Sequence, residues 1–244
     1  MAGAVLVGTS GYVYRHWRGG VFYPPGLRLQ DELAWYATRF RTVELNNPFY
    51  RVPSAETFAR WRDATPPDFI FAVKVSRFIS HALRLRAAAE PLRAFLELAR
   101  VLGSKLGPLL IQLPPDFQLD RSRLEAFLEV VPRDLRWTIE LRHPSWQLPA
   151  VYDALGRRDV ALCVPVGGRV QPDLVTTAPF TYLRMHAGAK PGGGFTDEQL
   201  RPWAARIRAL ARSGKDVYVY FNNDREGHAV RDAARLRELL GLTR

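Results

Sequence analysis

The sequence predicts an α/β protein, a TIM-barrel-like (β/α)₈ barrel that forms a single domain over residues 1–244. Eight short apolar runs recur along the chain, and most are separated by a stretch with helical spacing. Five runs end in polar residues that alternate with apolar ones, as in Val43 Glu44 Leu45 Asn46. Because a strand turns successive side chains to opposite faces, these polar residues share one face near the C-terminal end of each strand. This pattern is typical of a barrel with a site at its strand ends.

Strands and helices are expected to alternate, without a linker or a low-complexity run between them. The expected strands are 5–8, 42–46, 69–75, 109–113, 137–141, 160–164, 181–186 and 217–222. The expected helices are 29–40, 54–63, 91–103, 120–131, 149–158, 196–214 and 228–240. Thr196 with Gln199 forms a capping box, and Gly214 ends that helix. Between Pro165 and Pro179 only a short or irregular sixth helix fits.

The alternation within the strands favours a closed barrel over a doubly wound open sheet. Residues of one parity are apolar and are expected to face the helices: Val43, Leu45, Val73, Ile139, Leu141, Leu183, Val217 and Val219. Residues of the other parity are expected to face the barrel interior: Glu44, Lys74, Glu140, Arg184 and Asn222. An open parallel sheet is covered by helices on both faces, and its strands would be almost continuously apolar.

The composition predicts a cytoplasmic protein with no membrane partner. Hydrophobic residues make up 47% of the chain, which is enough for a full core. No apolar run reaches the roughly 18 residues of a membrane span, and residues 4–8 are too short for a signal peptide. The single cysteine, Cys163, lies within an apolar run and is expected to be a buried thiol.

The net charge of +11 is typical of nucleic-acid binding, because surplus cations neutralise phosphates. However, 31 of the basic residues are arginines and only 4 are lysines, a skew that codon bias explains better than a dedicated patch. Several arginines, including Arg206, Arg208 and Arg212, lie on an expected helix face that solvent would cover. A small anionic molecule is therefore the preferred partner, and nucleic acid is the alternative.

Motifs along nearly the whole chain resemble those of the YecE-like family, a domain of unknown function (number 72). They are Gly8 Thr9 Ser10 Gly11 Tyr12 with Tyr14 and Trp17, Phe22 Tyr23 Pro24, Val43 Glu44 Leu45 Asn46 with Phe49, Tyr50 and Pro53, Phe71 Ala72 Val73 Lys74 with His81, Gln112 Leu113 Pro114 Pro115, Glu140 Leu141 Arg142 His143 with Trp146, Tyr182 with Arg184 and His186, and Tyr218 Val219 Tyr220 Phe221 Asn222 Asn223 Asp224. The resemblance implies a TIM-barrel-like fold and no established reaction.

The polar strand ends predict one site at the C-terminal mouth of the barrel, suited to a small substrate with a phosphate or carboxylate. Glu44 and Glu140 are assigned as base and acid, and Lys74 and His186 as electrophilic or proton-transfer groups. A desolvated lysine near a second cation is expected to have a lowered pKa. The residues expected to bind substrate are Ser10, Tyr12, Trp17, Asn46, Tyr50, His81, Gln112, Arg142, His143, Trp146, Arg184, Tyr220, Asn222 and Asn223.

A purely structural interpretation of these charges stays open. Glu44 paired with Lys74, and Glu140 paired with Arg142 or Arg184, would only satisfy buried ions. Glu44, Glu140 and His186 are also suitable metal ligands, but no helical H-x-x-x-H motif or cysteine cluster accompanies them, so no metal site is assigned. The sequence assigns neither a cofactor nor an oligomeric state.

The segment from Tyr12 to Pro25 interleaves aromatic residues with arginines. It is expected to fold as a lid over the mouth, because a long loop in a compact domain usually packs on its own side chains. Alternatively, Tyr12, Trp17 and Tyr50 would stack on exposed bases.

Known nucleotide-binding and nucleophile-elbow motifs are missing: the chain has no G-x-x-x-x-G-K-[ST], G-x-G-x-x-G or G-x-S-x-G. The preferred function is therefore an enzyme, a hydrolase, lyase or isomerase that uses acid/base chemistry without a redox cofactor. The alternatives are a nucleic-acid binding or processing protein and a non-catalytic binding domain.

Overall fold

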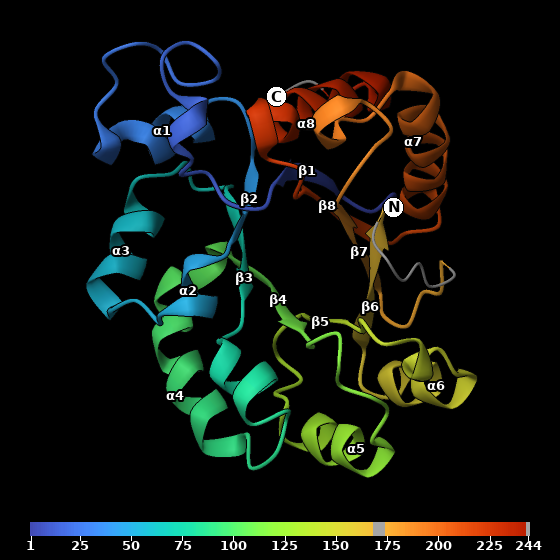
Figure 1. Cartoon of the computed structure of the whole chain (residues 1–244). Helices are drawn as coiled ribbons and strands as arrows, with labels where there is room; N and C mark the ends of the chain where they lie inside the picture. The colour runs from blue at the N-terminus through green and yellow to red at the C-terminus, as the bar shows by residue number, and fades with distance from the viewer. Residues whose placement is uncertain (168–173, 243–244) are drawn as a thin grey trace.

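The computed structural model describes residues 1–167 and 174–242, and over these ranges it confirms the TIM-barrel-like fold. Eight parallel strands form one sheet in the order β1-β8-β7-β6-β5-β4-β3-β2, and the helices lie outside it (Figure 1). The strands are β1 (Val5–Thr9), β2 (Thr42–Leu45), β3 (Ile70–Lys74), β4 (Leu106–Gln112), β5 (Trp137–Glu140), β6 (Val160–Val166), β7 (Phe180–Met185) and β8 (Asp216–Phe221).

The helices follow the expected alternation. They are α1 (Glu32–Ala37), α2 (Asn47–Tyr50), α3 (Ala55–Asp63), α4 (Ala89–Ala99), α5 (Arg121–Val130), α6 (Pro149–Gly156), α7 (Asp197–Arg212) and α8 (His228–Leu240). The predicted capping box of Thr196 and Gln199 begins α7. Residues 168–173 of the segment between Pro165 and Pro179, where a short helix is expected, lie outside the described residues. No helix among the described residues has the length and apolar character needed to cross a membrane.

The barrel closes at a narrow seam between its first two strands. β1 pairs with β8 over its full length. Towards β2, the chain makes an isolated parallel bridge between Ser10, just after β1, and Glu44 in β2. Gly8 permits this close approach, because a Cβ there would lie 2.2 Å from the Thr42 carbonyl oxygen. The Tyr36 hydroxyl fills the rest of the seam: it accepts from the Thr9 N–H and donates to the Thr42 carbonyl, both at 3.0 Å.

Two apolar layers stabilise the barrel, one on each side of the strands. The larger layer lies between strands and helices and contains all eight apolar residues predicted to face the helices. The smaller layer fills the barrel interior with Ala72, Leu110, Ala161, Cys163, Ala178, Phe180, Tyr182, Tyr218 and Tyr220. The interior below the mouth is therefore packed by side chains, and any ligand site must lie above this layer. Burial raises the pKa of the Cys163 thiol, as expected for an inert cysteine.

Candidate functional site

The strand register sorts the polar residues into levels along the barrel axis. Glu44 pairs with Ala72 in the register of β2 and β3, so Lys74 lies two residues nearer the mouth than Glu44. On β4 and β5, Gln112 pairs with Glu140. The alternation of side chains along each strand directs these residues into the barrel. The register between neighbouring strands determines which of their side chains are in contact.

Arg184 on β7 is at the centre of the buried layer beneath the mouth. Its side chain is 2% exposed and makes ion pairs with two carboxylates, at 2.8 Å to Glu44 and at 2.8 Å to Glu140. Its Nε also donates to the second oxygen of Glu44 at 3.1 Å, so this pair is bidentate. The expected pairing of Glu140 with Arg184 is thus present.

Neutral hydroxyl groups complete the coordination of the Glu44 carboxylate. Ser10 Oγ donates to one of its oxygens at 2.6 Å, and the Tyr182 hydroxyl donates to the other at 2.6 Å. Burial alone would raise the pKa of Glu44 and of Glu140, but the Arg184 charge and the hydrogen bonds outweigh it and hold both pKa values below their ordinary range. Both carboxylates are therefore ionised and fully engaged.

Lys74 lies in a different environment from the one expected if it paired with Glu44. That pairing is wrong: the strand register places Glu44 beside Ala72, and the Glu44 carboxylate pairs with Arg184. Lys74 Nζ instead donates to Gln112 Oε1 at 2.8 Å and lies 3.8 Å from the centre of the Phe49 ring. Burial and the nearby Arg184 charge lower the pKa of Lys74 to about 8, as the sequence predicts for a desolvated lysine beside a cation.

Gln112 connects the lysine to the buried layer. Its Nε2 donates to both oxygens of Glu140 at 2.9 Å, which turns its carbonyl oxygen towards Lys74. A flipped amide would place its oxygen against the carboxylate and its NH₂ against the ammonium, so the orientation is fixed by both neighbours.

His186 and Arg142 lie above the Glu140 carboxylate on the pocket side. His186 Nδ1 is 3.2 Å from the Asn222 side-chain amide, and its Nε2 is 3.8 Å from Glu140. Burial and the Arg184 charge lower the pKa of His186, so its imidazole is neutral at pH 7. Arg142 is 40% exposed, and its Nε lies 3.9 Å from Glu140, too far for a strong ion pair.

These residues surround a pocket of about 510 Å³ at the C-terminal ends of the strands. Its lining contains nine predicted site residues: Tyr12, Asn46, Tyr50, Lys74, Gln112, Arg142, Arg184, His186 and Asn222. Glu44, Glu140 and Ser10 lie directly beneath this lining rather than in it. The Asn46 Oδ1 atom is buried and has no hydrogen-bond partner among the described residues, as expected for a group that binds a ligand or water.

Three aromatic residues predicted to bind substrate are buried elsewhere, and these assignments are corrected. Trp17 is 0% exposed beneath its own loop, with its Nε1 donating to the Asp224 carbonyl. Trp146 is also 0% exposed and packs edge-on against Phe117. Tyr220 lies within the barrel, where its hydroxyl bonds Thr42. Core packing therefore accounts for all three.

Three polar predictions also lie outside the pocket lining. The Asn223 amide is buried and donates to Asp232 and to the Gly193 carbonyl, so it supports a loop. His143 bonds Ser145 and caps the turn that follows β5. His81 packs edge-on against Phe49, and burial and the Lys74 charge lower its pKa, so it lies behind the Phe49 ring that contacts Lys74.

The loop after β1 forms one wall of the pocket and is folded on itself. Tyr12, Val13 and Tyr14 line the wall, and the Tyr23 hydroxyl returns to donate to the Tyr12 carbonyl at 2.5 Å. Trp17 is packed beneath them, so the loop does not present it for stacking. The wall residue Tyr14 was not assigned to the site from the sequence, although it has the same parity as Tyr12 in the same motif.

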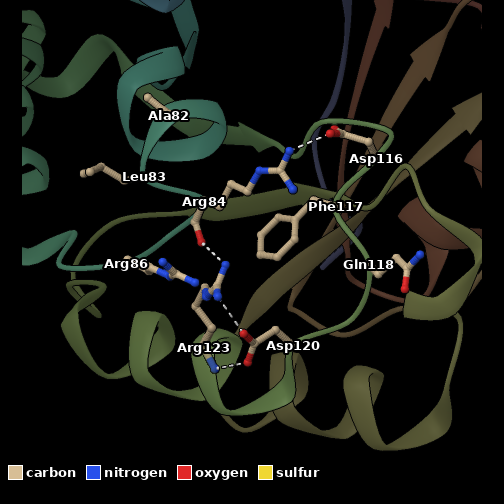
Figure 2. A pocket seen from close by; sticks show the side chains of 9 residues that line it. All are labelled: Ala82, Leu83, Arg84, Arg86, Asp116, Phe117, Gln118, Asp120 and Arg123. Atoms are coloured by element: carbon tan, nitrogen blue, oxygen red, sulfur yellow. Dashed lines mark hydrogen bonds and ion pairs between the residues drawn. The ribbon is translucent and has the colours of Figure 1, made fainter.

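A second pocket, of about 560 Å³, lies on the loops that follow β3 and β4. Figure 2 shows Arg84 reaching Asp116 and Arg123 reaching Asp120 around the ring of Phe117. Carboxylates thus pair with two of its arginines, and none of the described residues that line it is a lysine, histidine, cysteine or tyrosine. The barrel-mouth pocket, which combines several cations with titratable groups, is the better candidate for chemistry.

Within residues 1–167 and 174–242, no group of three histidine, cysteine or acidic side chains has the arrangement of a metal site. Glu44 and Glu140 are separated by the Arg184 guanidinium, which binds both of them. A cation between these carboxylates would have to displace that guanidinium.

The fold and the mouth together define a single-domain (β/α)₈ barrel with a polar, cation-rich pocket at its C-terminal face. Residues 6–244 match the family model described as "Protein of unknown function DUF72". The chain therefore belongs to this family, as its motifs predict.

Two curated proteins and a solved structure are similar to half or more of the chain. The UPF0759 protein YunF of Bacillus subtilis (strain 168) is 27% identical over 90% of this chain and 90% of its own length. The UPF0759 protein YecE of Escherichia coli (strain K12) is 33% identical over 51% of this chain and 46% of its own length. The crystal structure of a DUF72 family protein from Thermotoga maritima MSB8 has a TM-score of 0.85 at 29% identity and covers 98% of this chain and 100% of that one.

Proposed function

We propose that the protein is an enzyme that binds a small anionic substrate at the barrel mouth and transforms it by acid/base chemistry. The observation that carries this proposal is the order of charges along the barrel axis. Lys74, Arg142 and Arg184 line the pocket together with one carboxylate, Asp224, among the described residues, whereas the carboxylates of Glu44 and Glu140 lie beneath them. A substrate in the mouth therefore meets more cations than carboxylates, which favours a phosphate or carboxylate group.

The roles within the site follow from which groups reach the pocket. Lys74 and His186 line it and have lowered pKa values, so they are the proton-transfer groups of this proposal. Glu44 and Glu140, predicted from the sequence to be base and acid, are ionised and bonded from below, so here they position Arg184 and Gln112. Arg142 and Arg184 would bind the anionic group.

The Asn46 side chain adds a polar group to the lining of the pocket. Its buried oxygen has no partner among the described residues, so it would accept a hydrogen bond from a substrate hydroxyl or amine. This favours a substrate that carries both an anionic group and a hydrogen-bond donor.

The test is calorimetric titration with a panel of small phosphates and carboxylates, with single-stranded DNA and RNA as additional ligands. Arg142→Gln removes a half-exposed pocket cation, and Arg212→Gln removes an exposed arginine at the end of α7, far from the mouth. We expect a small anion to bind the wild type and the Arg212→Gln variant equally, and Arg142→Gln to weaken binding about tenfold.

Two outcomes would overturn this proposal. One is that no small anion binds, or that Arg142→Gln leaves its affinity unchanged. The other is that only DNA or RNA binds, with an affinity that falls steeply between two salt concentrations, which would favour the nucleic-acid alternative. Measuring whether the bound anion is consumed in the same mixtures distinguishes an enzyme from a binding domain.

A further inference from the structure

Compared with the buried Lys105, whose Nζ donates to three oxygen atoms, Lys74 has few groups that stabilise its ammonium. Its Nζ meets two uncharged partners, the Gln112 carbonyl oxygen and the Phe49 ring face. None of the carboxylates of the described residues lies within ion-pair distance of it, although the residue is 6% exposed and lines the pocket. A buried ammonium is normally stabilised by an acidic partner, and a carbonyl oxygen and a ring face stabilise it less than a carboxylate would. Burial therefore favours the neutral form of this amine more than that of a lysine paired with a carboxylate.

We propose that Lys74 is a nucleophile that forms an imine with an aldehyde or ketone bearing an anionic group. This inference rests on the proposed function of the same pocket and names its substrate class. Arg142 and Arg184 would bind the anionic group of this substrate, while the carbonyl carbon faces the Lys74 amine.

The chemistry of the step requires an uncharged amine, and the surroundings of Lys74 supply one. At a pKa of about 8, about a tenth of the amine is neutral at pH 7, which is roughly 200 to 300 times the fraction of an ordinary lysine. The charged or titratable groups around it are Glu44, His81, Glu140, Arg142, Cys163 and Arg184. Of these, the carboxylates favour the ammonium, and Arg142 and Arg184 disfavour it.

Imine formation balances without an oxidant or a reductant. The amine lone pair of Lys74 forms a bond to the carbonyl carbon, and the C=O electron pair moves to oxygen, which takes a proton. The nitrogen then loses its protons as the hydroxyl leaves as water, and the C=N bond is complete. His186 lines the same pocket with a neutral imidazole at pH 7 and can move these protons. Hydrolysis by the reverse path regenerates the lysine.

The other lysines provide internal controls, because the chain has four in total. Lys105 is also buried, but its Nζ donates to the Thr65 carbonyl at 2.6 Å and to the Arg62 carbonyl, so its charge is held by oxygen acceptors. Lys190 is exposed on the loop after β7. A reagent that reacts with any accessible amine would modify Lys190, whereas a reagent guided by the pocket would modify Lys74.

The experiment traps the imine with sodium borohydride in the wild-type protein. Glyoxylate serves as the anionic aldehyde and propionaldehyde as a neutral one, and peptide mass mapping measures the rate at each lysine. We expect glyoxylate to modify Lys74 at least about tenfold faster than Lys190 at pH 7, with a rate that levels off above about pH 8. Lys74→Arg should lose this modification. Arg142→Gln should slow glyoxylate more than propionaldehyde, because it removes the anion-binding charge and also raises the pKa of Lys74.

The proposal is overturned if Lys74 is modified no faster than Lys190, or if its rate keeps rising to the pH of an ordinary lysine. The main measurement uses the wild-type protein and does not depend on the folding of any variant. Its failure is distinguishable from failure of the proposed function, because the calorimetric titration detects anion binding without any reaction. Anions that bind without trapping Lys74 would remove the imine and leave the acid/base proposal standing.

Discussion

Removal of the charge on Glu44 tests whether the layer beneath the pocket is a tightly coupled ion network. Glu44 is 0% exposed and accepts from Ser10, Tyr182 and two nitrogens of Arg184. Glu44→Gln keeps the shape but places an NH₂ group among donors. Of the carboxylates that the structure describes, it leaves only Glu140 paired with Arg184. We therefore expect a substantial loss of stability rather than a silent change.

The size of this loss follows from the burial of the pair. Breaking a buried ion pair by removing one partner costs about 3 to 5 kcal/mol. Because Glu140 still binds Arg184 at 2.8 Å, we expect the lower end of this range, about 3 kcal/mol. For a chain of this length each kcal/mol lowers the melting temperature by about 2 to 4 °C, which gives a decrease of roughly 6 to 12 °C.

The assay is thermal and urea unfolding followed by circular dichroism at pH 7. The control is Glu97→Gln, because the Glu97 side chain is 66% exposed and its pair with Arg93 is long, at 3.5 Å. That variant should stay within about 0.5 kcal/mol of the wild type. A decrease of less than about 2 °C for Glu44→Gln would refute a tightly coupled network and return the carboxylate to the list of candidate acid/base groups.

Two further predictions concern pH and the seam. The pKa values of Glu44 and Glu140 are lowered by folding, so the stability from their ionisation is complete above the unfolded value of about 4.3 and is lost as the pH falls through the folded values. Urea unfolding at pH 7, 5 and 3.5 should show this loss below about pH 4, and equal acid sensitivity of Glu44→Gln would contradict it. Tyr36→Phe removes the hydroxyl that bonds the buried Thr9 N–H and the Thr42 carbonyl, which should lower the free energy of unfolding by about 1 to 3 kcal/mol. Hydrogen exchange of the Thr9 amide should become faster. An unchanged exchange rate would show that the hydroxyl does not hold the seam.

The sequence predicted the barrel well because side-chain alternation is a local property. Each apolar residue assigned to the helix side, such as Val43 and Val219, lies in the outer apolar layer. The bounds of the elements were less predictable. The expected helix over 29–40 is instead a short turn followed by α1, and β4 begins at Leu106, three residues before the expected start.

The candidate site was predictable in its members but not in their contacts. Alternation places Glu44 and Lys74 in the interior, yet their levels depend on the register of β2 and β3, which no local pattern contains. The same limit explains Trp17, because an aromatic residue in a loop can cover a ligand or fill the core beneath the loop, and long-range packing decides between them.

The charges of the mouth place a constraint on any anionic substrate of Lys74. A negative group beside the amine would raise the pKa of Lys74 and suppress the neutral form that imine formation requires. A neighbouring cation must therefore offset that charge, and Arg184 is already shared by two carboxylates. Arg142 is a pocket cation whose one carboxylate contact within the described residues is long, at 3.9 Å. In our proposal it both binds the anionic group and keeps the Lys74 amine reactive, so Arg142→Gln should reduce the trapping of glyoxylate by more than its loss of affinity alone.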